Sequence, residues 1–207
     1  MKNNTTEMVF ILDRSGSMYG LEKDTIGGFN SLIEKQKLID GKCYVSTVLF
    51  DDKSKVIHDR IDLRKVPQMT EKDYYVQGCT ALLDAVGGAI HHIGNIHKYA
   101  RPEDVPEKTM FVIITDGMEN ASHLYSSHDV KRMIGKQKEK YCWEFLFIGA
   151  NIDAACEAEK IGIDRNRAAN YTASPKCTAN LYNVVERAVG NYRTSACFNE
   201  SWSDDIR

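Results

Sequence analysis

The stretch MVFILDRSGSM, residues 8–18, joins an uninterrupted apolar run to an acid and two serines. The five apolar residues 8–12 are the right length for a strand that is buried on both faces. The run stops at Asp13, and Ser15 and Ser17 follow on either side of Gly16, which permits a tight turn. This order predicts a central strand that presents one carboxylate and two hydroxyls at its carboxyl end.

The rest of the chain alternates between strand and helix patterns, which favours an α/β domain with a doubly wound, mostly parallel sheet and helices on both faces. We expect this single domain to cover residues 1–193 and a polar, loosely held tail to cover residues 194–207. The expected strands are 8–12, 43–50, an antiparallel edge strand over 55–63, 109–116, 143–150 and a weak strand over 167–173; the expected helices are 21–39, 82–93, one with Ser127 as its N-cap, 153–161 closed by Gly162, and 178–192.

The bulk composition excludes several classes of protein. The formal net charge of the 207 residues is −2, which gives no general attraction to nucleic acid or to an anionic membrane. No apolar run approaches the roughly 18 residues of a membrane-spanning helix, and the N-terminus does not resemble a secretion signal. The six cysteines are scattered without a CxxC pair, so we expect reduced thiols and a cytoplasmic protein.

A second apolar strand, TMFVIITD (residues 109–116), also ends in an aspartate, Asp116. If the two strands are parallel neighbours, Asp13 and Asp116 meet at one edge of the sheet, where two carboxylates repel unless a cation or a proton intervenes. Ser15 and Ser17 add hydroxyl oxygens, and Thr80 at the start of a helix offers a third. Oxygen ligands of this kind select Mg²⁺, Mn²⁺ or Ca²⁺ over zinc or copper. Taken singly, the serines and Asp13 would be ordinary turn or helix-cap residues.

The ordered set DRSGS (13–17), Thr80 in QGCTALLDA, and Asp116 with Gly117 in VIITDGMEN resembles the metal-ion-dependent adhesion site (MIDAS) of von Willebrand factor type A domains. The resemblance implies a six-stranded, Rossmann-like sheet of order 3-2-1-4-5-6 with strand 3 antiparallel. It also implies direct metal coordination by Ser15 and Ser17, direct or water-mediated coordination by Thr80, and largely water-mediated contact by Asp13 and Asp116. One departure is Cys79, where the family commonly has glycine.

We therefore expect a stand-alone, bacterial-type binding module that docks an acidic residue of a protein partner through a divalent cation, most simply Mg²⁺. The resemblance points to ATPase or chelatase assemblies as partners, with no nucleic acid and no membrane involved. The set offers no evident nucleophile or general base, so we expect no catalytic residues and no enzyme activity. Two alternatives are a Mg²⁺-dependent phosphohydrolase or phosphotransferase on a similar fold, which usually needs a second acid where Ser15 stands, and a structural module with a vestigial site.

Four further expectations concern residues near this set. His91, His92 and His97 are expected on the solvated surface, and Cys79 is expected to fill a small space. Tyr74 and Tyr75 either face a partner or pack on their own domain. In some members of the resembling family the last helix, here 178–192, slides when ligand binds; we expect a mostly rigid docking site instead.

Overall fold

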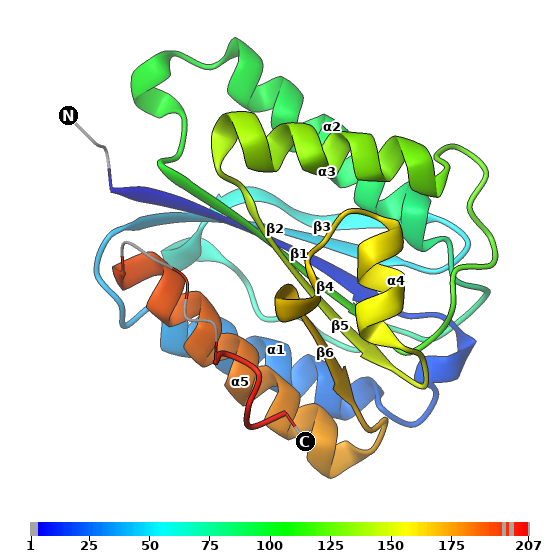
Figure 1. Cartoon of the computed structure of the whole chain (residues 1–207). Helices are drawn as coiled ribbons and strands as arrows, with labels where there is room; N and C mark the ends of the chain where they lie inside the picture. The colour runs from blue at the N-terminus through cyan, green and yellow to red at the C-terminus, as the bar shows by residue number, and fades with distance from the viewer. Residues whose placement is uncertain (1–3, 196–197, 199–200, 207) are drawn as a thin grey trace.

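The computed structural model describes residues 4–195, 198 and 201–206 of the chain. Within these residues, strands and helices alternate as the sequence pattern predicts (Figure 1). The strands are β1 (Thr5–Asp13), β2 (Lys42–Phe50), β3 (Ser54–Asp62), β4 (Lys108–Thr115), β5 (Glu144–Ala150) and β6 (Ala168–Tyr171). The α-helices are α1 (Glu22–Gln36), α2 (Leu82–Tyr99), α3 (Ser127–Tyr141), α4 (Ala154–Lys160) and α5 (Pro175–Thr194).

The strands form one six-stranded sheet in the order β3-β2-β1-β4-β5-β6. All neighbours pair in parallel except β2 and β3, which are antiparallel, so the expected fold class is confirmed. The chain leaves β1 toward β2 on one side and returns at β4 on the other. The direction of winding therefore reverses between β1 and β4, and in sheets of this kind ligands bind in the crevice at that point.

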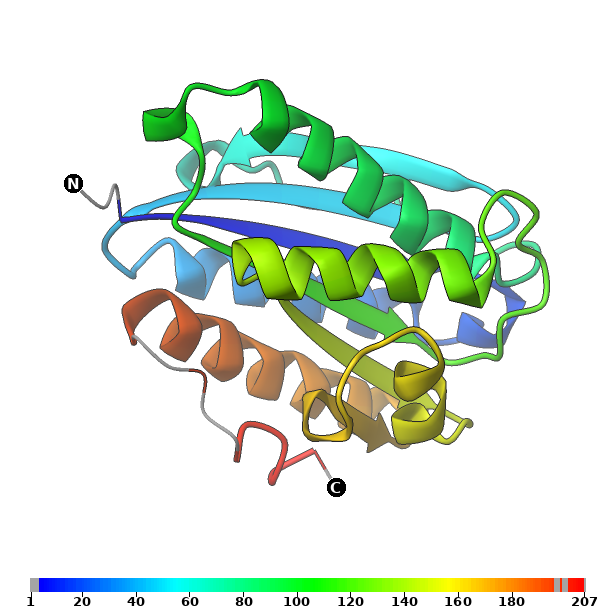
Figure 2. The ribbon, with the colours of Figure 1, turned by 45° about the horizontal axis from the view of Figure 1, so that its top comes forward.

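Two hydrophobic cores lie on opposite faces of the sheet. Helices α1 and α5 cover one face, and α2, α3 and α4 cover the other (Figures 1 and 2). Strand β1 is buried along its whole length because alternate side chains enter the two cores: Phe10 packs with α1 and α5, and Ile11 packs with α2. The continuous apolar run in the sequence has this double burial as its physical cause.

Two helix starts differ from the sequence prediction. The N-cap of α3 is Ser126, not Ser127, and its side chain forms a capping box with Asp129. Helix α5 begins at Pro175, three residues earlier than expected, because Ser174 caps it and proline suits the first turn. Gly162 does close α4, with a φ of +86°.

The C-terminal end of α5 is tied to the body of the protein. The Arg193 guanidinium donates hydrogen bonds to the carbonyl oxygens of Gln36 (2.6 Å), the last residue of α1, and of Ile39 (3.1 Å), just beyond that helix. From β4, the Lys108 ammonium donates to the carbonyl oxygens of Tyr192 (2.9 Å) and Ser195 (2.7 Å). These contacts satisfy carbonyl groups at helix ends that would otherwise lack partners.

The described part of the tail is not loose, contrary to our expectation. Trp202 and Ile206 are buried against the core on the α5 side of the sheet, and the Trp202 indole donates to the Asn166 carbonyl oxygen (2.8 Å). Although the segment is polar on average, the favourable free energy of burying these two large apolar side chains holds it against the core.

Candidate metal centre

The five predicted site residues lie at the carboxyl edge of the sheet, where β1 and β4 end. Leu12 pairs with Ile114, so Asp13 is level with Thr115 and one residue from the level of Asp116. The loop after β1 carries Ser15 and Ser17, and the segment before α2 carries Thr80. Four of the five, all except Ser17, are buried.

Asp13 is held by neighbours on both strands. One carboxylate oxygen accepts a hydrogen bond from the Ser15 amide (2.7 Å), and the other accepts from the Thr115 hydroxyl (2.6 Å). Both oxygens are therefore occupied within the protein. Asp13 is fixed in place and suited to act on an ion through an intervening water.

The two serine hydroxyls lie together beside Asp116. The Oγ atoms of Ser15 and Ser17 are 3.1 Å apart, and the Ser17 hydroxyl donates to one carboxylate oxygen of Asp116. Ser15 occupies the N-cap position of the short 3-10 helix at Gly16–Met18, but its side chain makes no capping hydrogen bond there. The interpretation of Ser15 as a simple cap residue therefore lacks the contact that it requires.

Thr80 and Gly117 complete the cluster. A Cβ atom placed on Gly117 would lie 3.2 Å from the Thr80 Oγ1 and 3.3 Å from the Ser17 Oγ. The loop after β1 and the segment before α2 thus bring two hydroxyls over the same glycine, and the missing side chain leaves the space between them open. Such a cradle is large enough only for a small group.

Burial changes the acid chemistry of both aspartates. Burial raises the pKa of Asp116 to about 6, with a smaller upward contribution from the nearby Asp13 carboxylate, although the hydrogen bond from Ser17 opposes the shift. The pKa of Asp13 is also raised by burial, although hydrogen bonds from Ser15 and Thr115 oppose the shift. Without a cation, the site therefore strains to hold two negative charges.

These observations fit a small divalent cation. Among the described residues, the second carboxylate oxygen of Asp116 is buried without a hydrogen-bond partner. The donors are three hydroxyls and two carboxylates, all hard oxygens. The described residues contain no group of three or more His, Cys, Asp or Glu side chains that could hold a metal. A cation here would depend on serine and threonine oxygens as well as on acid.

A buried ion pair that sequence reasoning missed supports the loop after β1. The Arg14 guanidinium lies 2.7 Å from a carboxylate oxygen of Asp51, and the side chains of both are at least 95% buried. The backbone of Arg14 also donates to the Phe50 carbonyl oxygen (2.8 Å) and accepts from the Gln77 amide (2.9 Å). Arg14 thereby fixes the chain between Asp13 and Ser15.

The same turn after β2, Asp51 with Asp52, also holds the segment that leads to Thr80. The Asp51 carboxylate accepts from the Gln77 side-chain amide (2.8 Å), and its carbonyl oxygen accepts from the Ala81 amide (2.9 Å). The Asp52 carboxylate accepts from the Cys79 amide (2.7 Å). Two loops that are distant in sequence are therefore attached to one turn.

The third loop, after β4, is attached to the start of α2. The Asn120 side chain accepts from the Thr80 amide (2.9 Å), and the Asn120 amide donates back to the Thr80 carbonyl oxygen (3.1 Å). The Glu119 carboxylate accepts from the Leu83 amide (2.9 Å). Glu119 and Asn120 therefore position the loop. In the sequence, the sign of this role is that two polar residues follow Asp116 by three and four positions.

The structure also settles the neighbouring tyrosines and Cys79. Tyr74 is buried and its hydroxyl donates to the Asp13 carbonyl oxygen, whereas Tyr75 is 43% exposed and lies under the Arg14 guanidinium, 4.7 Å from its ring centre. Cys79 is exposed, so our prediction of a space-filling residue was wrong. The tight turn there is made by Gly78, whose φ is +65°.

Two of the three histidines are on the surface as predicted. His91 and His92 are exposed. His97 differs, because its Nε2 lies 2.6 Å from the carboxylate of Glu7, a residue of β1 with no exposed surface. The helical period places His97 over the start of β1, which the sequence pattern alone did not reveal.

Comparisons with solved structures give the fold, whereas comparisons with family models and curated proteins give no match. In the described residues no helix is long and apolar enough to cross a membrane.

Several solved structures match over most of the chain. Proximal thread matrix protein 1 from the mussel byssus, with a zinc-occupied MIDAS motif, is 14% identical with a TM-score of 0.60 over 89% of this chain and 46% of that one. Manganese-loaded Plasmodium vivax TRAP protein is 18% identical with a TM-score of 0.59, and the match covers 84% of this chain and 70% of that one. A von Willebrand factor type A protein from Catenulispora acidiphila is 15% identical with a TM-score of 0.58, and the match covers 90% of this chain and 43% of that one.

The chain therefore has the von Willebrand factor type A fold that the sequence resemblance indicated. It spans about half the length of the mussel protein and of the Catenulispora protein. Of the three structures described above, the mussel protein holds zinc at its MIDAS motif and the TRAP protein is loaded with manganese.

Proposed function

We propose that this protein is a divalent-cation-dependent binding module, and that the cation is held by Ser15, Ser17 and Thr80 directly and by Asp13 and Asp116 through water. The bound ion would keep one position open for a carboxylate of a protein partner. Mg²⁺ is the expected physiological ion because it is a hard cation that retains waters and takes few direct carboxylates.

One observation carries the proposal: a buried Asp116 oxygen has no hydrogen-bond partner among the described residues, beside the Thr80 and Ser17 hydroxyls that converge over Gly117. A buried carboxylate without full satisfaction is costly unless something compensates it. A cation in the cradle supplies that compensation and explains why glycine is placed there.

The surface around the cluster supports a protein partner. Tyr19 (84% exposed), Tyr75 (43%) and Met118 (61%) come from the three loops that carry the site. Exposed aromatic and methionine side chains are typical of binding surfaces, where they bury large apolar areas. A partner acid flanked by apolar residues would suit both the ion and this rim.

The hydrogen bonds of the five site residues support binding rather than catalysis. Among the described residues, none of the hydrogen bonds made by the five side chains involves an imidazole or an amine. A hydrolase would need a general base within hydrogen-bond reach of its nucleophile. We further propose that the protein acts inside the cell, which is supported by the five described cysteines, all of them free thiols. The partner that we propose is an ATPase or chelatase assembly.

Calorimetric titration with MgCl₂ and MnCl₂ tests the metal. We expect one site per chain in the wild type and none in Asp116→Asn or Ser17→Ala, while the exposed-residue controls Asp40→Asn and Ser31→Ala keep wild-type affinity. Bound ion at 100 times its dissociation constant should stabilise the fold by about 2.7 kcal/mol. A wild type that binds neither ion at millimolar concentration would refute the proposal.

A second experiment tests the carboxylate. We would titrate N-acetyl-Leu-Asp-amide and its asparagine analogue into isotopically labelled protein, with Mg²⁺ or with EDTA. We expect amide shifts at Ser15, Thr80 and Gly117 only for the aspartyl peptide with Mg²⁺. Equal shifts with the asparagine analogue would mean that the ion does not receive a carboxylate.

A further inference from the structure

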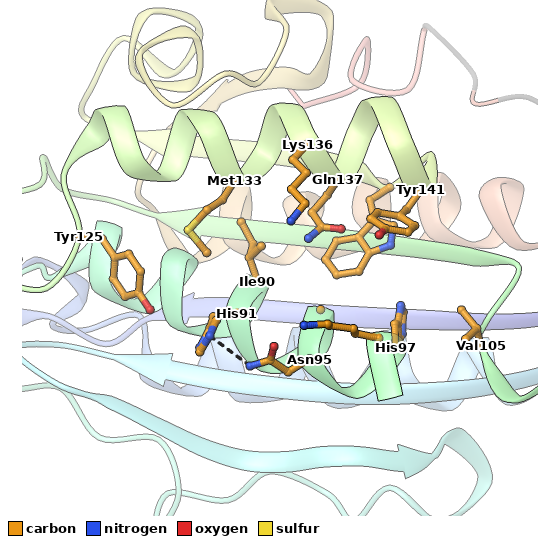
Figure 3. Close-up of a pocket in the computed structure, with 13 residues that line it drawn as sticks. Ile90, His91, Asn95, His97, Val105, Tyr125, Met133, Lys136, Gln137 and Tyr141 are labelled. Carbon is orange, nitrogen blue, oxygen red and sulfur yellow. Dashed lines mark hydrogen bonds between the residues drawn. The ribbon is translucent and has the colours of Figure 1, made fainter. Parts of the chain in front are cut away.

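A separate cavity of about 550 Å³ lies between helices α2 and α3, on the face of the sheet opposite α1 and α5. Figure 3 shows His91 and Asn95 on α2 facing Met133 and Lys136 on α3 across this space. Its volume lies within the range of about 300–1,000 Å³ that is typical of small-molecule sites. None of the five residues of the candidate metal centre lines it.

The inner wall of the cavity is apolar and rigid. Ile90 and Trp143 are 1% and 4% exposed, and Met133 lies beside them. The Trp143 indole stacks on Phe111 of β4, with ring centres 5.2 Å apart and planes 19° apart. The indole is thereby fixed at the inner wall, where the part of its ring that lines the cavity can contact a flat apolar ligand.

A glycine in the middle of α2 keeps this space open. A Cβ atom on Gly94 would lie 3.2 Å from the Gln137 amide nitrogen and 4.0 Å from the Trp143 ring, both of which line the cavity. Glycine inside a helix costs about 1 kcal/mol relative to alanine. The position thus gives up helix stability where a side chain would enter the cavity wall.

The charged groups at the cavity are cationic. Lys98 and Lys136 line it, and no Asp or Glu is among the described residues that do so. The lining residue His97 is bonded to the carboxylate of Glu7 (2.6 Å), which also pairs with Arg60 (2.7 Å) and has no exposed surface. Lys98 and Lys136 therefore bring two positive charges to the cavity wall, and no carboxylate is among the described residues that line it.

We propose that this cavity binds a small aromatic acid: a flat apolar ring system that stacks near Trp143, with a carboxylate placed between Lys98 and Lys136. The apolar wall selects the ring and the two ammonium groups select the negative charge. Asn95 and Gln137 offer amide groups that orient the carboxylate. An acid of naphthalene size fits the volume without displacing the helices.

The test compares 2-naphthoate with its neutral analogue 2-naphthamide by calorimetric titration of the full chain. EDTA is present throughout, so that an ion at the candidate metal centre cannot receive the carboxylate. We expect naphthoate to bind one site with a dissociation constant below about 1 mM and at least fivefold more tightly than naphthamide, which corresponds to two exposed ion pairs. Absence of naphthoate binding, or equal affinity for the two compounds, would overturn the proposal.

Variants place the binding in the cavity. The double substitution Lys98→Gln with Lys136→Gln should erase the preference for the acid, whereas Lys140→Gln, on an exposed position of α3 outside the cavity, should not. Asn95→Trp should block both compounds from an exposed position on α2, and Arg132→Trp, which adds the same bulk to α3 outside the cavity, should not. Unchanged naphthoate affinity in Asn95→Trp, with the variant's melting temperature near that of the wild type, would show that the acid binds elsewhere.

Discussion

Replacing Asp51 by asparagine should destabilise the protein severely although the side chain keeps its shape. The substitution removes the negative charge that faces Arg14 and leaves the guanidinium buried, since the side chains of both residues are at least 95% buried. Arginine cannot lose its proton to escape this cost. Among the described residues, the Nε and Nη1 of Arg14 already lack hydrogen-bond partners, so no other group can take over.

Breaking a buried pair by removing one partner costs about 3–5 kcal/mol. We expect the lower end, about 3 kcal/mol, because the guanidinium keeps its stacking on the partly exposed Tyr75 ring. For a chain of 207 residues this corresponds to a melting temperature lower by about 6–12 °C. The increase in melting temperature on adding Mg²⁺ should also shrink, because Arg14 fixes the loop that carries Ser15.

Urea unfolding and thermal melts measure both effects. Asp59→Asn is the matched control: Asp59 pairs with His92 at 2.8 Å, but both side chains are about half exposed, so the change should stay within about 0.5 kcal/mol. The double substitution Arg14→Gln with Asp51→Asn should recover at least about 1 kcal/mol relative to Asp51→Asn alone, because the unpaired charge is gone. An Asp51→Asn protein that melts within 1–2 °C of the wild type would refute the assignment of this pair as a support of the site.

Three further results are expected. Because the pKa of Asp116 is raised to about 6, its contribution to stability without metal is fully present below about pH 4 and is lost as the pH rises through 6. The difference in unfolding free energy between the wild type and Asp116→Asn should therefore change by about 3 kcal/mol from pH 4 to 7, and Mg²⁺ should reverse this loss of stability. Identical pH profiles for the two proteins would contradict the raised pKa. Gly117→Ala should weaken Mg²⁺ binding at least tenfold in calorimetry with little loss of stability, because its Cβ fills the cradle 3.2 Å from the nearest hydroxyl; unchanged affinity would place the ion elsewhere. In urea unfolding, Gly87→Ala should cost about 1–3 kcal/mol because its Cβ would lie 2.6 Å from the Tyr125 ring, whereas Gly88→Ala, which meets open space, should be neutral or stabilising; equal effects would contradict this packing.

Much of the fold could be predicted because its signals are local. The runs 8–12 and 109–116 are apolar without interruption, which requires burial on both faces, and their terminal aspartates mark the carboxyl edge of the sheet. The order of the strands came from the family resemblance, because period and spacing alone do not fix which strands are neighbours. The site residues were found through their order along the chain, and the structure brings them together; their role as metal ligands stays a proposal.

The residues that hold the site could not be predicted because their partners are distant in sequence. Arg14 reads as a solvated turn residue until Asp51, 37 positions later, is placed beside it. His97 gave no sign of its buried partner Glu7, 90 positions earlier. The tail was misjudged for a related reason: its average polarity hid two apolar side chains, Trp202 and Ile206, that find the core.

The anchoring of α5 has a consequence for the time course of partner binding. A sliding motion of this helix along its axis would break the hydrogen bonds that Arg193 and Lys108 make to carbonyl oxygens at and just after the end of α1 and at the end of α5. Because this end of α5 is anchored, we expect partner binding to proceed without a slow displacement of the helix. Stopped-flow traces of association should then fit one exponential whose rate rises linearly with partner concentration. The ratio of the dissociation and association rate constants should equal the dissociation constant measured at equilibrium, as for a one-step reaction.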